Sequence, residues 1–124
     1  MEKLTAKEEE VMQILWDLKK SIVRDIIDKI PNPKPPYTTV ASVVRILEKK
    51  GFVGHKSYGT TYEYYPLITK RAYTKRTFNH LLQNYFDDSL KNVVSFMVKE
   101  RKMSPEEIEK LLKMVHEEDK NQTK

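Results

Sequence analysis

Residues 37–66, YTTVASVVRILEKKGFVGHKSYGTTYEYYP, decide the fold, because two periodicities meet within them. In the first half, apolar residues recur at the three- and four-residue spacing of an amphipathic helix. They are Val40, Val43, Val44 and Leu47. We expect Thr38 to cap this helix and Gly51 to end it, just after Lys50, in the left-handed conformation that glycine favours.

The opposite face of this helix combines short hydroxyls with long cations. Its apolar neighbours are Ala41 and Ile46. The polar residues of the face are Thr38, Ser42, Arg45 and Lys49. A helix with one apolar and one cationic face is expected to pack through the first and to present the second to solvent or to a partner.

After Phe52 the apolar period changes to two, which is typical of strands. Residues 53–57 alternate, and residues 60–65 alternate again, with Tyr62 and Tyr64 on one face. A glycine-containing turn between two such runs predicts a β-hairpin, which Pro66 closes. All three glycines of the chain, Gly51, Gly54 and Gly59, lie in this segment, so we expect helices on both sides of it.

Two helices are expected before residue 31. Thr5 and Glu8 have the spacing of a capping box, and an apolar stripe follows at helical spacing. Its members are Val11, Ile14, Leu15 and Leu18, with Trp16 beside them as a core anchor. Ser21-Ile22 is expected to be a short extended linker, and the second helix runs from Val23 to Ile30, where Pro31 ends it.

Residues 31–36 contain four of the six prolines. Such a segment is either a stiff linker between domains or a rigid turn between two packed helices. The turn is favoured, because the apolar stripes on both sides are too short to form separate cores.

The remainder of the chain is expected to be helical. Thr69 is a candidate cap of a first helix, and residues 87–89 (Asp-Asp-Ser) interrupt the helical pattern. A further helix start is expected at Ser104-Pro105-Glu106-Glu107, which provides an N-cap serine, a proline at the first position and a capping-box glutamate. The apolar residues of this region either pack back on the N-terminal core or, as we favour, cover each other in a dimer. The candidates for dimerisation are Leu81, Leu82, Tyr85, Phe86, Leu90, Val93, Val94, Met97, Leu111, Leu112 and Val115.

Three helices followed by a β-hairpin is the order of a winged helix-turn-helix. The expected architecture is therefore mainly α with a small hairpin wing: a DNA-binding domain over residues 1–66 and a helical dimerisation region over residues 67–124. Hydroxyl groups near the helix start can bond phosphate, Arg45 can reach a base edge, and wing cations can contact the backbone. The candidate DNA-binding residues are Thr38, Thr39, Ser42, Arg45, Lys49, Lys50, His55, Lys56, Tyr58 and Thr60.

The charge distribution favours a polyanionic partner. The 124 residues carry 23 Lys+Arg and 18 Asp+Glu, a net charge of +5. Residues 34–56 hold five cations and one acid, and residues 67–86 hold four cations and no acid. Residues 104–119 hold two cations and six acids. The basic character is therefore concentrated around the expected third helix and wing.

Composition argues against several classes of function. The chain has no cysteine, which excludes disulfides, thiolate metal sites and a cysteine nucleophile. His55, His80 and His116 are isolated, and the sequence has no P-loop, dinucleotide fingerprint or nucleophile elbow. We expect no enzymatic activity, no cofactor and no metal. No run approaches the ~18 apolar residues of a membrane span and the first residues are not typical of a signal peptide, so a cytoplasmic location without membrane insertion is expected.

A winged-helix module that binds proteins is the main alternative. Such a module would expose apolar or acidic residues on the 38–49 face. That face offers threonine, serine, arginine and lysine instead, which favours DNA.

Several strings, in order and spacing, carry a resemblance to a known family. They are Leu4-Thr5, Val11-Met12-Gln13-Ile14-Leu15-Trp16, Tyr37-Thr38-Thr39-Val40, Leu47-Glu48-Lys49-Lys50-Gly51, Gly59 to Pro66, and the helix start from Met103 to Ile108. Over about residues 4–115 the chain resembles the BlaI/MecI/CopY group, the penicillinase repressors. The resemblance implies a homodimeric repressor of palindromic operators, in which Thr38, Thr39 and Ser42 match operator-contacting positions.

The sequence departs from the family pattern at two positions. Ile46 stands where the family commonly has arginine, with Arg45 one position earlier, and Thr60 follows the wing glycine in place of a cation. Both positions bear on the operator sequence and on backbone contact.

The family resemblance also implies how repression could be relieved. Its copper-responsive branch uses a C-terminal cysteine cluster, which this chain lacks. Its β-lactam-responsive branch implies a membrane metalloprotease sensor system and cleavage in the dimerisation region. The aligned residues here are Ser95, Phe96 and Met97.

Overall fold

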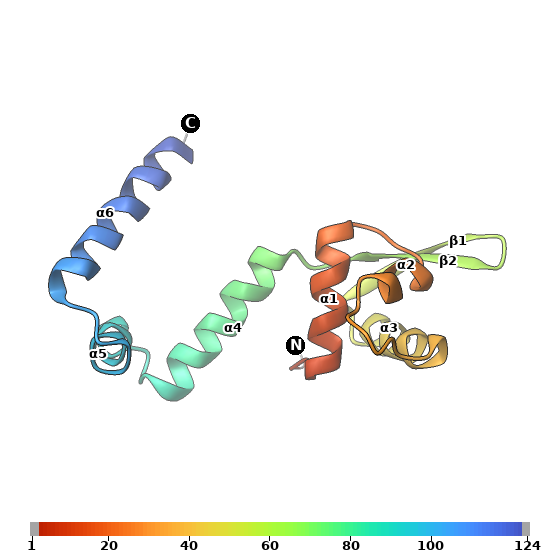
Figure 1. The fold of residues 1–124 in the computed structure, drawn as a ribbon, viewed down its shortest axis with the longest axis horizontal. Helices are drawn as coiled ribbons and strands as arrows, with labels where there is room; N and C mark the ends of the chain where they lie inside the picture. Colours follow the sequence, from red (N-terminus) through yellow and green to blue (C-terminus); the bar gives the residue numbers. More distant parts are fainter. Residues whose placement is uncertain (1–2, 123–124) are drawn as a thin grey trace. The chain divides into compact units, whose positions relative to one another are not determined.

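A computed structural model describes residues 3–122, and side chains over residues 3–118. The chain divides into two compact units, residues 1–75 and residues 76–124. Among the described residues the fold is mainly helical, with one two-stranded antiparallel sheet, and its elements follow the expected order (Figure 1). The first unit extends beyond Pro66 to Lys75, because Ile68 and Tyr73 pack against the N-terminal core.

The first helix, α1, spans Ala6–Leu18 and begins at the predicted capping box. The backbone N–H of Glu8 donates to Oγ1 of Thr5 at 3.2 Å, and the N–H of Thr5 donates to Oε1 of Glu8 at 2.8 Å. The buried side of the helix carries Val11, Met12 and Leu15. The capping prediction is confirmed, and the Glu8 carboxylate has a further partner described below.

The proline-rich segment is a turn within one core. It joins α2, Val23–Asp28, to α3, Tyr37–Lys49, and both helices bury residues in the same apolar cluster. Nζ of Lys34 donates to the carbonyl oxygens of Ile27, Asp28 and Ile30 at 3.1, 2.8 and 2.6 Å. Lys34 thereby satisfies carbonyl groups at the end of α2, and the alternative of a domain linker is wrong.

The start of α3 differs from expectation. The N-cap is Pro36, and no side chain caps the helix, so the prediction that Thr38 does so is wrong. Proline fixes the extended backbone angle that an N-cap requires, and the Pro36 carbonyl accepts from the N–H of Thr39 at 3.1 Å. The buried face also includes Ala41, expected on the exposed side, whereas Val43 is only half-buried.

The hairpin consists of β1, Val53–Tyr58, and β2, Thr61–Pro66, paired so that His55 faces Tyr64 and Ser57 faces Tyr62. Gly51 and Gly59 have φ angles of +87° and +62°, which confirms the left-handed end of α3 and the glycine turn. The residues expected to be a linker do more than connect helices. Ser21 pairs with Tyr64 through two backbone hydrogen bonds of 2.8 and 2.7 Å, and so joins the hairpin base to the segment between α1 and α2.

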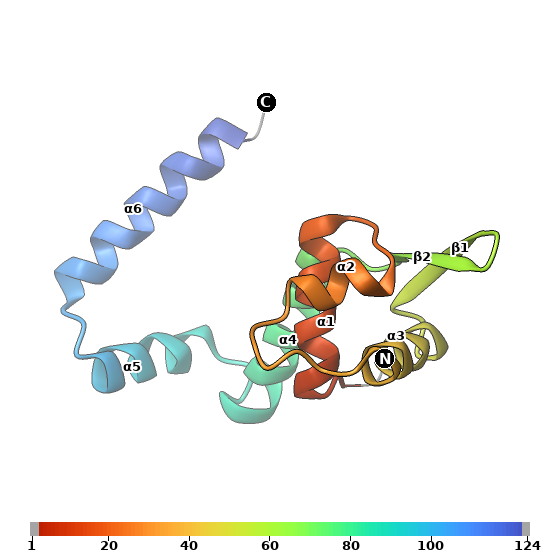
Figure 2. The ribbon, with the colours of Figure 1, turned by 45° about the vertical axis from the view of Figure 1, so that its right-hand side comes forward.

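One apolar core holds these elements together. It draws on α1, α2, α3 and the hairpin base, which lie side by side in two views (Figures 1 and 2). Phe52, Met12, Leu15, Ile26 and Leu47 are its largest fully buried side chains. Burying side chains of this size contributes roughly 2–3 kcal/mol each in apolar transfer free energy.

Trp16 packs on the edge of this core, as expected of an anchor. Its Nε1–H donates to the carbonyl of Ile68 at 2.9 Å, and its ring lies 5.5 Å from that of Tyr73. These contacts bind the segment after the hairpin to α1.

The C-terminal helices begin where the sequence indicated. They are α4, Lys70–Tyr85, α5, Leu90–Arg101, and α6, Pro105–Gln122. The Thr69 hydroxyl accepts from the N–H of Ala72 at 3.0 Å, and Ser104 and Glu107 form the predicted capping box. None of the side chains of α4 or α5 is buried within this single chain.

Candidate nucleic-acid interface

The outward face of α3 presents five of the residues expected to contact DNA. Thr38, Thr39, Ser42, Arg45 and Lys49 are all exposed. Since they occupy about three turns of one helix, they form a continuous polar strip of hydroxyls followed by cations. Ile46, with 45% of its surface exposed, is an apolar residue beside the strip, and it suits contact with a thymine methyl group.

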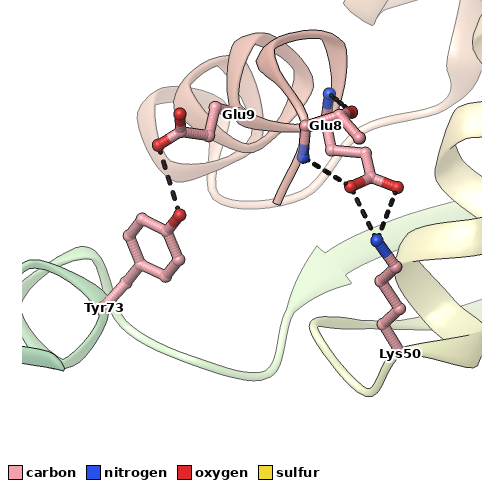
Figure 3. A network of polar contacts seen from close by, with 5 residues as sticks. Glu8, Glu9, Lys50 and Tyr73 are labelled. Carbon is pink, nitrogen blue, oxygen red and sulfur yellow. Dashed lines mark hydrogen bonds and ion pairs between the residues drawn. The ribbon is translucent and has the colours of Figure 1, made fainter. Parts of the chain in front are cut away.

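Lys50 does not belong to this strip. Its Nζ lies 2.8 and 3.0 Å from the two carboxylate oxygens of Glu8, in α1 (Figure 3). The Glu8 side chain is 6% exposed and that of Lys50 is 18% exposed. Lys50 therefore forms a structural ion pair that binds the end of α3 to the start of α1, and its expected contact with DNA stays a prediction.

The electrostatics of Glu8 follow from this pairing. Burial on its own raises the pKa of the Glu8 carboxyl. The hydrogen bonds from Lys50 and Thr5, with the positive charge of Lys50, outweigh that effect and hold the pKa below its ordinary value. The carboxylate is thus charged at neutral pH.

The far end of the hairpin is a second exposed polar surface. Lys56, Tyr58 and Thr60 are all exposed, as expected of wing residues that contact a nucleic-acid backbone. Nζ of Lys56 lies 5.5 Å from the centre of the Tyr58 ring, within the range of a cation–π contact. Both views show this end of the hairpin projecting beyond the three helices of its unit (Figures 1 and 2).

His55 faces inward from the hairpin instead of outward. Its Nδ1 lies 2.5 Å from Oε2 of Glu48 in α3, and its ring stacks on Tyr62 with 4.3 Å between centroids. The side chain is two-thirds buried. His55 therefore connects the hairpin to α3 through Nδ1, and its expected contact with phosphate stays a prediction.

A cleft lies between α2, α3 and the hairpin, and it encloses about 450 Å³. Arg24 of α2, Tyr37 and Arg45 of α3, and Thr60 and Thr61 of the hairpin line it. Sequence reasoning missed Arg24. Its helix has six residues, too few for a periodic polar face to stand out, and only the fold brings it beside Tyr37, where its guanidinium carbon lies 5.9 Å from the ring centre.

Tyr64 lies at the buried side of this cleft, with 4% of its surface exposed. Burial raises the pKa of its phenol, and the Glu48 carboxylate adds to the increase, whereas the charge of Arg45 opposes it. The phenol is therefore neutral at physiological pH and can donate a hydrogen bond.

The residues expected to form a dimer are not buried in the single chain. Large apolar side chains with at least two-fifths of their surface exposed occur on all three C-terminal helices. They include Leu81, Tyr85, Leu90, Val94, Leu111, Leu112 and Val115 of the expected set, together with Phe78, Phe96 and Met114. Leu82, Phe86, Val93 and Met97 are half-buried, with the Phe86 ring packed edge-on against Phe96.

Residues 95–97, the expected cleavage region, lie within α5 and are helical. Phe96 is half exposed, whereas Ser95 and Met97 are partly covered. Proteases bind their substrates in extended form, so cleavage here requires local opening of α5.

Neither a metal site nor a membrane span is found in the described part of the chain. No three histidine, aspartate or glutamate side chains gather where they could hold an ion. No described helix is both long and apolar enough to cross a bilayer.

Comparison with known proteins gives a consistent family assignment. A family model described as penicillinase repressor matches residues 4–117. The methicillin resistance regulatory protein MecI of Staphylococcus aureus strain N315 is 27% identical over 109 residues, covering 87% of this chain and 89% of MecI. The penicillinase repressor of Bacillus licheniformis is 26% identical over 117 residues, covering 93% of this chain and 90% of that protein.

A solved structure matches the N-terminal fold. The solution structure of the DNA-binding domain of the repressor BlaI superposes with a TM-score of 0.50 and 25% sequence identity. The match covers 59% of this chain and 94% of the BlaI domain. Two of these relatives, the penicillinase repressor and BlaI, are named as repressors, and the BlaI DNA-binding domain shares with this chain the winged-helix fold of its N-terminal unit.

Proposed function

Since the chain belongs to the penicillinase repressor family, we propose that it is a sequence-specific repressor whose α3 enters the major groove of its operator. The exposed strip from Thr38 to Lys49 carries this proposal. Hydroxyls at the start of the helix can bond phosphates, helped by free backbone N–H groups, while Ser42 and Arg45 lie further along and reach base edges. Lys56 and Tyr58 contact the adjoining backbone from the hairpin.

Binding to its own upstream DNA tests this proposal. Fluorescence anisotropy with a duplex from upstream of its gene should give a dissociation constant at least about 10³-fold below that of an unrelated duplex at the same salt concentration. Footprinting should then show protection of the same region. Equal affinity for both duplexes contradicts the proposal and supports the alternative of a module that binds proteins.

We also propose that two copies associate through the C-terminal helices. The support is the set of exposed apolar side chains on α4, α5 and α6. Exposed apolar surface that extends over several helices is typical of a protein–protein interface. A two-fold pair presents two α3 helices to half-sites about one helical turn apart, which predicts a palindromic operator. Light scattering at micromolar concentration should give twice the mass of one chain, and the mass of a single chain contradicts a dimer.

Relief of repression is proposed to follow from loss of the dimer. Two linked binding sites bind roughly 10²- to 10⁴-fold more tightly than one, so cutting the dimerisation region releases DNA without any change in α3. The segment around Phe96 is the proposed position, and a membrane metalloprotease sensor system is the proposed partner that initiates the cut. A chain ending at Phe96 should be monomeric and bind its operator weakly, and unaltered binding by that chain excludes this mechanism.

A further inference from the structure

The cleft between α2, α3 and the hairpin includes Arg24, a residue to which no contact with DNA has been assigned above. We propose that it holds one phosphate of the operator backbone, with Arg24 as its principal cation. This assignment rests on the proposed function and adds to it a contact from α2, an element not otherwise given a part in DNA binding.

The chemistry of the cleft favours an anion. Within the described part of the chain, the residues that line it include two arginines and no acid. The hydroxyls of Tyr37, Thr60 and Thr61 are further donors around the same space. Guanidinium groups bind phosphate through two parallel hydrogen bonds, and hydroxyls from two separate segments, α3 and the hairpin, can satisfy the remaining oxygens.

The position of the cleft favours a nucleic-acid backbone over a free anion. It adjoins the strip of α3 on one side and the exposed end of the hairpin on the other. When a helix lies in the major groove and a hairpin follows the adjoining backbone, the strand between them passes this opening. About 450 Å³ accommodates a phosphodiester with part of its two sugars.

The Arg24 side chain is both accessible and partly ordered before DNA binds. Its side chain is exposed, and its guanidinium lies over the Tyr37 ring at 5.9 Å, which limits the conformations that the long side chain must lose on binding. Arg45 also lines the cleft and belongs to the α3 strip as well. Arg24 is therefore the residue whose substitution reports on the cleft alone.

The salt dependence of binding tests the assignment. Each phosphate neutralised contributes about −0.9 to the slope of log K against log salt concentration. Arg24→Ala should make that slope less negative by about 0.9 for each α3 bound to DNA, and should weaken binding roughly ten-fold on operator and unrelated duplexes alike. Arg24→Lys keeps the charge and should restore the slope. Lys29→Ala removes the same charge from the end of α2, outside the cleft, and should leave the slope unchanged.

A neutral backbone locates the contact. Operators are prepared with a single neutral methylphosphonate at successive backbone positions. At one position in each half-site, this substitution should weaken binding by the wild-type protein but cause no further loss of binding by Arg24→Ala. Because Arg24 is exposed, the unfolding temperature should not change. An unchanged slope in Arg24→Ala, or a loss confined to the operator duplex, overturns the phosphate assignment. Equal binding of operator and unrelated DNA by the wild type contradicts the proposed function instead, and the slope on unrelated DNA still tests the cleft.

Discussion

Lys50, which follows the last residue of α3, lies 2.8 Å from Glu8 in the first turn of α1, although 42 residues separate them in the chain. Glu8 also completes the capping box of α1, so one carboxylate serves the start of one helix and the end of another. A second contact from the same turn, between Glu9 and the Tyr73 hydroxyl at 3.2 Å, binds the start of α4 (Figure 3). The first turn of α1 is therefore a junction between three helices.

Breaking the Glu8–Lys50 pair should destabilise the N-terminal unit. Lys50→Met leaves a buried carboxylate without its cation, and the free energy of unfolding should fall by about 3 kcal/mol. Urea unfolding followed by circular dichroism measures this free energy in the wild type and the variant. Lys7→Met is the matched control, since Lys7 pairs with Glu10 at 3.4 Å on the exposed side of α1 and should cost less than about 1 kcal/mol. Equal losses in the two variants contradict a structural role for the buried pair.

Acid should weaken the same junction. The pKa of Glu8 is lower in the folded chain than in the unfolded chain, where it takes its ordinary value near 4.5. The folded state therefore gains stability above that value and loses it as the pH falls through the folded pKa. Between pH 6 and pH 3 the wild type should lose more unfolding free energy than Glu8→Gln, which cannot titrate. Parallel curves for the two proteins exclude a contribution from Glu8.

Two cations of α3 should differ in what they recognise. Arg45→Ala removes a proposed base contact and should weaken operator binding and reduce preference for the operator by about 1–3 kcal/mol. Lys49→Ala, one turn further along, removes a proposed backbone contact and should weaken operator and unrelated DNA by the same factor. Competition binding with both duplexes separates the two effects. Unaltered preference in Arg45→Ala excludes it as a base-reading residue.

An apolar residue of α6 should govern assembly. Leu112 has 64% of its surface exposed, so Leu112→Asp should not disturb a single chain but should place a charge in the proposed dimer interface. We expect the mass measured by light scattering to fall to that of one chain, with operator binding at least about 10²-fold weaker. Lys113→Asp, at the neighbouring position, should remain dimeric. Dimers in both variants exclude Leu112 from the interface.

Local patterns predicted most of the fold because they are set by neighbouring residues. The Thr5–Glu8 and Ser104–Glu107 capping boxes and the glycine turn at Gly59 each involve residues within a few positions of one another. The start of α3 was misplaced for a local reason as well. Pro36 already has the N-cap conformation, so the helix begins before Thr38 can act as a cap.

The features that the sequence did not predict are contacts between residues far apart along the chain. A lysine at the end of a polar helix face is typical of a DNA-binding residue, and only the fold shows that Lys50 is paired with Glu8. Arg24 is the converse, since nothing in its own helix marks it until Tyr37 and the hairpin are brought beside it. The pairing of Ser21 with Tyr64 is made by backbone groups, which carry no information about residue type.

Because of that pairing, the two ends of the hairpin differ in how firmly they are held. The base is fixed by Ser21 and by the core, whereas every residue from 56 to 62 is exposed. Substitutions at exposed positions usually change stability by less than about 0.5 kcal/mol, so this end can vary while the base stays constant, except at Gly59, whose φ of +62° favours glycine, and at Tyr62, which stacks on His55. Substitutions at the hairpin end can therefore change the proposed contact with the DNA backbone at little risk to folding, so the strength of that contact can vary separately from stability.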